Sequence, residues 1–300
     1  MMKNLYFSLF LLVFISCKKG DDFKPDEPNV GAGAQTLLNV AYGGDNLQKM
    51  DIHLPANRTT ATTRVIVLIH GGAWAEGDKS DSLFAPIVDS LKRRYPDWAI
   101  FNLNYRLAKY KFPFSVDNRF PVQEEDVKSA IKYIYDRRST FGISDKWVYA
   151  GASAGGHLAL LQGYKNNTPI KPKAIVDFFG PTDMVALYDF YKTSPDGDTW
   201  SATAVQALMS GTPTGNPQMY YNSSPINYVT SQSPPTIILQ GGLDDVVPKE
   251  QSYSLEAKLT SVGVVNKLVY YYNQTHGWSD PVVVTDGFNQ MQAFLLANVP

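Results

Sequence analysis

One stretch near the middle of this 300-residue chain restricts its possible folds more than any other. A short apolar run at 147–150 leads into Gly-Ala-Ser-Ala-Gly and then directly into a second apolar run. This order predicts a strand, a sharp turn and a helix, with Ser153 at the apex in a strained backbone conformation and its hydroxyl pointing outward. Gly151 and Gly155 leave room for strand and helix to approach closely. Because Gly/Ser-rich turns recur by chance, a nucleophile at Ser153 needs support from the rest of the chain.

Around this stretch, apolar runs of strand length alternate with segments of helical spacing. Two early strands at 37–42 and 49–54 flank a Gly-Gly-Asp turn, which is a hairpin signal. A continuous β-branched run at 64–70 predicts a strand buried on both faces. Further strands are expected at 98–105, 147–150, 174–179, 236–240 and 267–272, and helices at 83–91, from Pro121, after Ser153, at 249–263 and at 288–295. Such alternation predicts an α/β fold with a mostly parallel eight-stranded sheet and helices on both faces.

One long segment, 181–233, has no strand signal. It follows the sixth expected strand and is rich in aromatic residues among Pro, Gly, Ser and Thr. A connection of this length is more often a functional insertion than a simple loop. We therefore expect an aromatic-rich, lid-like insertion that contributes a pocket wall; a decorative surface insertion is the alternative.

The beginning of the chain predicts export. Residues 1–16 combine Lys3 with an apolar run too short to span a bilayer, as in a signal peptide. The run ends at Cys17, the only cysteine, and Phe-Ile-Ser-Cys resembles a bacterial lipobox, in which the cysteine is lipidated. An ordinary signal peptide is the alternative, but a lone cysteine in an exported protein forms no internal disulfide, so an anchor explains it better.

The polar residues 17–34 predict a flexible tether, and 35–300 the single folded domain. The expected location is the cell envelope, periplasmic or at the cell surface, with membrane contact only through Cys17. Lys and Arg number 27 against 28 Asp and Glu, which gives no reason to expect a nucleic-acid partner. The sequence carries no signal for an oligomeric state.

A His-Gly-Gly-Ala-Trp run directly follows the buried strand at 64–70. An oxyanion hole needs backbone N–H groups aimed at one point, and small residues let a substrate oxygen reach them. We expect donors at Gly72, at Ala73 and at Ala154, the residue after the turn serine. His70 is expected to brace this loop.

A general base for Ser153 must be one of four histidines. His53 lies in the early hairpin, His70 at a strand end, and His157 one turn beyond Ser153 on the following helix. His276 remains, in a loop after the last strand, where the carboxyl edge of a parallel sheet brings loops together. A solvent-facing loop histidine is the alternative interpretation.

An orienting acid is expected between Ser153 and His276, after the strand at 236–240. Asp244 and Asp245 both follow that strand, and either carboxylate fits the role of holding the histidine tautomer. Asp183 is a weaker candidate.

Together these motifs resemble those of α/β-hydrolases in the esterase/lipase group related to hormone-sensitive lipase. Among these, the chain is similar to bacterial carboxylesterases with acetyl-xylan or feruloyl esterase relatives. The resemblance covers about 37–298 and rests on MDIHLP (50–55), HGGAW (70–74), NYRL (104–107), GASAGG (151–156), Asp244 and His276-Gly277. It implies an α/β-hydrolase fold without a cofactor, and no metal-ligand pattern is visible. It also favours Asp244, because the acid of such hydrolases lies in Gly-x-x-Asp-x-x-Val-Pro.

The resemblance implies a serine hydrolase that cleaves carboxylic esters through an acyl-enzyme, with Ser153, Asp244 and His276 as its triad. Its substrate is expected to be a small-molecule or carbohydrate ester. An exopeptidase of the prolyl-oligopeptidase type is one alternative, but no acidic pair is placed to hold a peptide amine. A non-catalytic binding lipoprotein is the other, but such proteins usually lack a triad member.

Three tryptophans are candidate pocket residues: Trp74 beside the oxyanion loop, Trp278 beside the base, and Trp200 in the insertion. Core packing is the alternative for the first two. The methyl group of Ala73, where relatives often have glycine, narrows the acyl site. These features predict short acyl chains on bulky or sugar-like alcohols.

Overall fold

The computed structural model describes residues 33–82, 85–111, 115–165 and 168–300. The signal peptide predicted at 1–16, the lipidation site at Cys17 and nearly all of the tether predicted at 17–34 lie outside these ranges and stay predictions. Within them, no helix is both long enough and apolar enough to cross a membrane.

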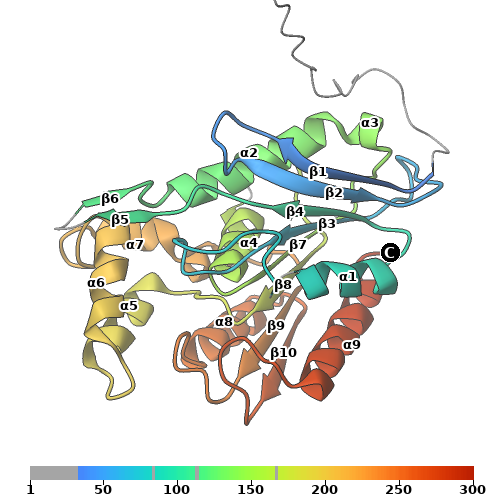
Figure 1. The fold of residues 1–300 in the computed structure, drawn as a ribbon. Helices are drawn as coiled ribbons and strands as arrows, with labels where there is room; N and C mark the ends of the chain where they lie inside the picture. Colours follow the sequence, from blue (N-terminus) through green and yellow to red (C-terminus); the bar gives the residue numbers. More distant parts are fainter. Residues whose placement is uncertain (1–32, 83–84, 112–114, 166–167) are drawn as a thin grey trace, which may run out of the picture.

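An eight-stranded sheet organises the fold, with the strand order β1-β2-β4-β3-β7-β8-β9-β10 (Figure 1). The strands are β1 (Gln35–Ala41), β2 (Lys49–Leu54), β3 (Val65–Ile69), β4 (Ala99–Leu103), β7 (Trp147–Ala152), β8 (Ala174–Phe178), β9 (Thr236–Gly241) and β10 (Asn266–Tyr271). From β4 to β10 all neighbours are parallel, whereas β2 pairs antiparallel with both β1 and β4. The eight strands and mostly parallel character are confirmed, in a sheet that is mixed at one edge.

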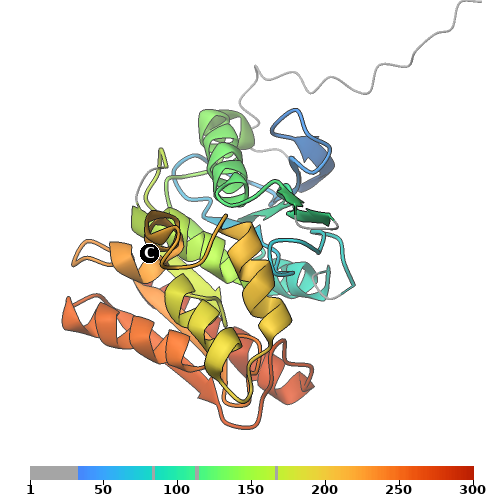
Figure 2. The same cartoon turned by 90° about the vertical axis from the view of Figure 1, so that its left-hand side faces the viewer.

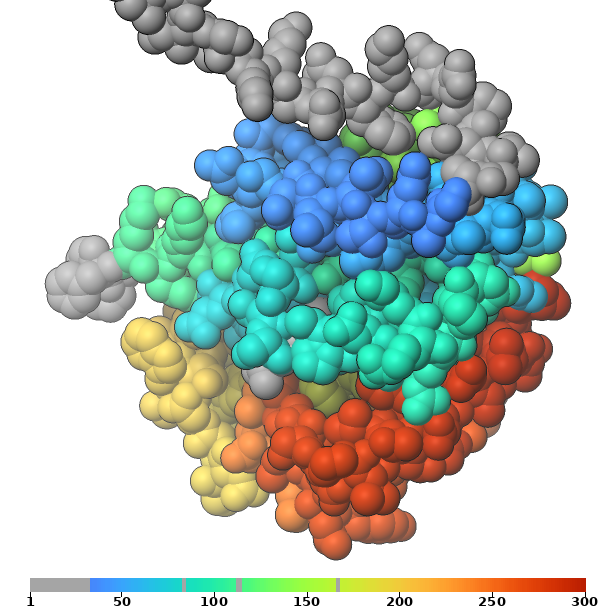
Figure 3. All heavy atoms as spheres, turned by 45° about the vertical axis from the view of Figure 1, so that its right-hand side comes forward, coloured from blue at the N-terminus to red at the C-terminus, as the bar shows by residue number. Residues whose placement is uncertain are grey.

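Helices cover both faces of this sheet because the central strands are apolar on both sides. All five residues of β3 are buried: Val65 and Val67 face one core, whereas Ile66 and Leu68 face the other. Helices α1 (Ala85–Arg94) and α9 (Pro281–Asn298) pack together on one side, where Figure 3 shows them in teal and red. The other side carries α2 (Val122–Asp136), α4 (Ala154–Lys165) and α8 (Glu250–Ser261).

Several short elements have no counterpart in the sequence prediction. They are β5 (Lys109–Lys111), β6 (Ser115–Asp117), α3 (Arg138–Phe141), α5 (Met184–Thr193), α6 (Thr199–Leu208), α7 (Pro217–Ser223) and the 3-10 helix η1 (Pro225–Tyr228). The last four make up most of the segment 181–233, which Figure 2 views from its own side in yellow to orange. Tyr188 and Tyr220 of this segment are core residues, and η1 packs on α4. Its lid-like role stays a prediction.

One of the candidate acids, Asp183, lies at the start of α5. Asp183 is the N-cap of this helix, and its carboxylate accepts hydrogen bonds from the backbone N–H groups of Val185 and Ala186. A capping side chain satisfies helix N–H groups that have no partner within the helix. Asp183 therefore has a local structural role.

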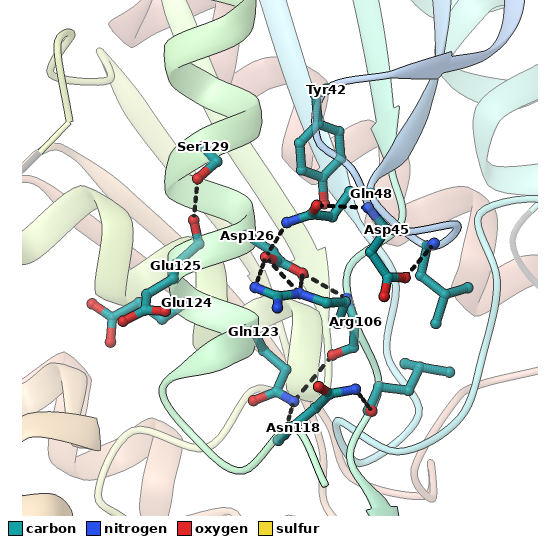
Figure 4. Close-up of polar contacts among 12 residues, drawn as sticks. Tyr42, Asp45, Gln48, Arg106, Asn118, Gln123, Glu124, Glu125, Asp126 and Ser129 are labelled. Carbon is teal, nitrogen blue, oxygen red and sulfur yellow. Dashed lines mark hydrogen bonds and ion pairs between the residues drawn. The ribbon is translucent and has the colours of Figure 1, made fainter.

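An ion pair between a partly exposed arginine and a buried carboxylate joins the loop after β4 to helix α2 (Figure 4). The guanidinium of Arg106 donates to the Asp126 carboxylate at 2.6 and 2.9 Å, and the Arg106 backbone N–H donates to it at 2.8 Å. Gln48 supplies a further donor at 2.7 Å. The side-chain hydrogen bond to Asp126 raises the pKa of Arg106, and the hydrogen bonds together satisfy a carboxylate that is only 1% exposed.

Replacing Asp126 with alanine should therefore lower the free energy of unfolding by about 1–3 kcal/mol, because the Arg106 backbone N–H and the Gln48 amide lose their acceptor while the partly exposed guanidinium can still be solvated. A control on the same helix is Asp136→Ala, which removes an exposed pair with Lys132. That change should cost less than about 1 kcal/mol. Denaturant unfolding followed by circular dichroism measures the free energy of unfolding of both variants. Equal decreases would show that burial of the Asp126 carboxylate makes no difference to the stability that its ion pair contributes.

Candidate active site

The turn between β7 and α4 has the geometry that the sequence predicts. Ser153 has a φ of 54°, a left-handed conformation that a residue with a Cβ rarely adopts. Its backbone N–H donates to Phe178 O at 2.8 Å, which fixes the turn against β8. A Cβ on Gly155 would lie 2.1 Å from Ile69 O. The strand–turn–helix unit around Ser153, which we call the elbow, therefore packs against the end of β3 only because residue 155 is glycine.

The oxyanion-loop candidate, residues 70–74, lies directly against this turn. A side chain at Gly71 would meet Ser153 Cβ at 3.2 Å. Gly72, Ala73 and Trp74 have φ values of 102°, 49° and 60°, so three consecutive residues are left-handed. Within the described residues, no hydrogen bond is donated by the backbone N–H of Gly72, Ala73 or Ala154. The oxyanion-hole role of these three N–H groups stays a prediction.

Two aromatic rings brace the start of this loop. His70 is buried and stacks on Tyr105, with ring centroids 4.4 Å apart and an interplanar angle of 12°. The Tyr105 hydroxyl donates to His70 O at 3.1 Å. Burial lowers the pKa of His70, so the ring does not carry charge at neutral pH. The expected bracing role of His70 agrees with this packing; Tyr105 belongs to the NYRL motif, but no bracing role was expected for it.

A carboxylate and a histidine are paired at the end of β9. His276 Nδ1 lies 2.8 Å from Asp244 Oδ2, and the Asp244 side chain has no solvent exposure. Its other oxygen accepts from the backbone N–H groups of Val246 and Val247 at 3.0 and 2.8 Å. Asp245 is exposed. The structure therefore pairs His276 with Asp244; the catalytic roles of both stay predictions.

Gln240 supports this pair from inside the sheet, and sequence analysis missed it. Its amide donates to Asp244 Oδ2 at 3.1 Å and to Val247 O at 3.2 Å, and Ser252 donates to its carbonyl at 2.7 Å. Both residues are fully buried. The available signal was a polar residue at the end of an otherwise apolar strand, four residues before the acid.

Ser153 and His276 are linked through Phe178 and Phe179. Phe178 O holds the Ser153 N–H, and the Phe179 ring packs edge-on against His276 with centroids 4.6 Å apart. No hydrogen bond joins Ser153 to His276 within the part of the chain that is described. Because Asp244 occupies Nδ1 of the imidazole, Nε2 is the nitrogen left to accept a proton.

His157 has a different environment from His276. Its ring is fully buried; Nδ1 lies 3.1 Å from Trp74 Nε1, and Nε2 lies 2.7 Å from Ser223 O. Burial lowers its pKa to about 3, so the ring is neutral. His53 contacts Thr36 between β1 and β2. Neither has a carboxylate partner among the described residues, which agrees with the elimination made from sequence.

The three tryptophans that were candidate pocket residues lie in three different surroundings, and a substrate-contacting role for them stays a prediction. Trp74 is 5% exposed and belongs to the core, where its ring meets that of His157 edge-on. Trp278 packs among aromatic rings near His276, and its ring centroid lies 4.7 Å from that of Tyr271 and 5.5 Å from that of Phe179. Trp200 is 72% exposed on α6. Core packing, the alternative for Trp74, is what the structure shows.

A cavity of about 710 Å³ lies beside Asp244, lined by α5, the loop 242–248 and the start of α8. Neither Ser153 nor His276 lines it, so we do not assign it to the substrate. Across the described ranges, no group of three or more His, Cys, Asp or Glu side chains is placed to hold a metal ion.

The strand order, the elbow at Ser153 and the carboxylate–histidine pair are those of an α/β-hydrolase of the esterase type. The BD-FAE family model matches residues 50–259, and the chain belongs to this family. The resemblance to α/β-hydrolase esterases is therefore confirmed, on sequence as well as on fold.

Individual relatives agree with this assignment. Esterase LipC of Mycobacterium tuberculosis is 27% identical over 231 residues, which are 74% of this chain and 55% of that protein. A truncated form of a carbohydrate esterase from gut microbiota superposes with a TM-score of 0.72 at 25% identity, over 91% of this chain and 99% of that one. A bifunctional GH43-CE protein of Bacteroides eggerthii gives 0.71 at 25% identity, over 88% and 38%. The chain spans about half the length of the curated relatives it matches.

The two adjacent aspartates should differ sharply in their effect on turnover. Asp244→Asn should lower kcat by about three to four orders of magnitude, because the amide favours the wrong histidine tautomer. Asp245→Asn should cost less than about tenfold, since it alters only an exposed charge. Steady-state kinetics on p-nitrophenyl acetate measure both effects, and a reversed order would assign the acid to Asp245.

Proposed function

We propose that this protein is a serine carboxylic-ester hydrolase acting through an acyl-enzyme. The observation that carries the proposal is the Asp244–His276 pair beside the strained turn at Ser153. A buried carboxylate on Nδ1 makes Nε2 a base and stabilises the imidazolium that forms. The relatives named esterases support the same reaction class.

In this mechanism Ser153 Oγ attacks the acyl carbon while His276 Nε2 takes the hydroxyl proton. The carbonyl electron pair moves to oxygen, where the N–H groups of Gly72, Ala73 and Ala154 stabilise the negative charge. Collapse breaks the ester C–O bond, and the alcohol leaves with the proton from His276. Water then adds to the acyl-enzyme by the same route and releases the acid, which restores Ser153.

For the substrate, we propose short acyl groups on sugar-like alcohols. The support for a sugar-like alcohol is the structural similarity to a carbohydrate esterase, which covers 99% of the chain of that esterase. The support for a short acyl group is the exposed Ala73, whose methyl group lies in the predicted oxyanion loop. Trp74 no longer supports it, because its ring is in the core.

Ser153→Ala should abolish ester hydrolysis and leave the thermal midpoint nearly unchanged, because the hydroxyl makes no hydrogen bond within the described residues. A fluorophosphonate probe should label the wild type once and the variant not at all. Ser261→Ala, an exposed position on α8, is the matched control and should keep full activity. Retention of more than a few per cent of wild-type kcat by Ser153→Ala would remove the serine mechanism.

The acyl preference should appear as a maximum of kcat/KM at acetate or butyrate in a p-nitrophenyl series that extends to octanoate and palmitate. Each methylene that does not fit should reduce kcat/KM by roughly tenfold. Ala73→Gly should move the maximum toward longer chains if the methyl group sets the limit. A wild-type maximum at octanoate or longer would refute the small acyl site. Acetylated xylan and methyl ferulate, assayed in parallel, test the sugar-borne alcohol.

A further inference from the structure

Two buried hydrogen bonds connect Trp74, His157 and Ser223. The indole Nε1 of Trp74 lies 3.1 Å from His157 Nδ1, and His157 Nε2 lies 2.7 Å from Ser223 O. The rings of Trp74 and His157 meet edge-on with centroids 5.1 Å apart. These two hydrogen bonds thus join the oxyanion loop, helix α4 and the end of α7 in the segment 181–233.

The direction of both hydrogen bonds follows from the chemistry of the groups. An indole nitrogen only donates, so Nδ1 of His157 must accept. The imidazole is neutral because burial lowers the pKa of His157, so its one proton is on Nε2 and is donated to Ser223 O. The tautomer is therefore fixed, and His157 serves as a rigid connector rather than as a titrating group.

The oxyanion loop needs such a support. Ala73 and Trp74 both adopt left-handed φ values, which are unfavourable for residues with a Cβ and persist only when the surroundings hold them. Trp74 is the only large side chain of the loop 71–74, and it is the one buried in the core. Its backbone carbonyl also accepts from Ala108 N at 2.8 Å. The orientation of Trp74 thereby fixes the peptide groups immediately before it.

We propose that His157 is a positioning residue for the oxyanion hole, acting through the Trp74 indole to aim the N–H groups of Gly72 and Ala73. This rests on the proposed esterase function. The role differs from general packing, because it depends on an acceptor at the Nδ1 position and not on the volume of the ring.

Two substitutions separate the two hydrogen bonds of His157. In His157→Asn, the amide oxygen occupies the place of Nδ1, so it keeps the acceptor for Trp74 and loses the bond to Ser223. In His157→Gln, the longer side chain keeps a donor near the place of Nε2 and loses the acceptor for Trp74. Trp74→Phe removes the indole N–H and retains an aromatic ring in the core.

The expected result is that His157→Gln and Trp74→Phe lower kcat by about 10- to 100-fold on p-nitrophenyl acetate, the range for misaligned oxyanion donors. KM should change by less than about threefold, because the donors act mainly on the transition state. A trifluoromethyl ketone that forms a tetrahedral adduct should bind more weakly by the same factor. His157→Asn should stay within about threefold of wild type, and the pH profile of kcat should not shift, since the Asp244–His276 pair is intact.

Two outcomes would overturn the proposal: Trp74→Phe with unchanged kcat and ketone affinity, or His157→Asn as impaired as His157→Gln. If a His157 variant does not fold, Trp74→Phe decides alone. Fluorophosphonate labelling of Ser153 in the same variants keeps the two hypotheses distinct. A labelled wild type with an unaffected Trp74→Phe rejects only the positioning role, whereas a fully active Ser153→Ala rejects the esterase mechanism itself.

Discussion

The geometry of the candidate site depends on the hydrogen bonds that the buried carboxylate of Asp244 accepts. An ionised carboxylate without solvent is costly unless hydrogen bonds replace the water. Here Val246 and Val247 of its own loop, Gln240 of β9 and His276 all donate to it. Because these donors come from separate segments, satisfying one charge fixes the end of β9, the loop after it and the loop after β10 in a single arrangement.

Much of this arrangement is readable from sequence, because it follows from local patterns. Continuous apolar runs such as that of β3 give the parallel strands, and the glycines around Ser153 give the elbow. Parallel strands end at one edge of a sheet, so the loop after β10, which carries His276, and the loop after β9, which carries Asp244, lie at the same edge. The choice between Asp244 and Asp245 depended on resemblance, and the hydrogen bond to His276 supplies the geometric reason.

What sequence analysis missed depends on contacts between distant segments. The inward direction of the Trp74 ring goes together with three consecutive left-handed residues, which no periodicity reveals. Helices α5, α6 and α7 are short and lie among turn residues, so their local signals are confined to their starts: the N-caps Asp183 and Asp198, and Pro217 in the first turn of α7. Gln240 looks like an interruption of an apolar strand until the buried acid beside it explains why a polar side chain is there.

His157 and His276 show how environment divides the work between identical side chains. His157 is buried without a carboxylate, so desolvation removes its charged form and leaves a neutral connector with both nitrogens engaged. His276 has a carboxylate on one nitrogen and remains 19% exposed on its side chain, so a positive charge there has both a partner and solvent. A base must be able to hold a proton during the reaction, whereas a support must never take one. The burial pattern of the fold therefore suits His157 to the proposed supporting role and His276 to the proposed role of base.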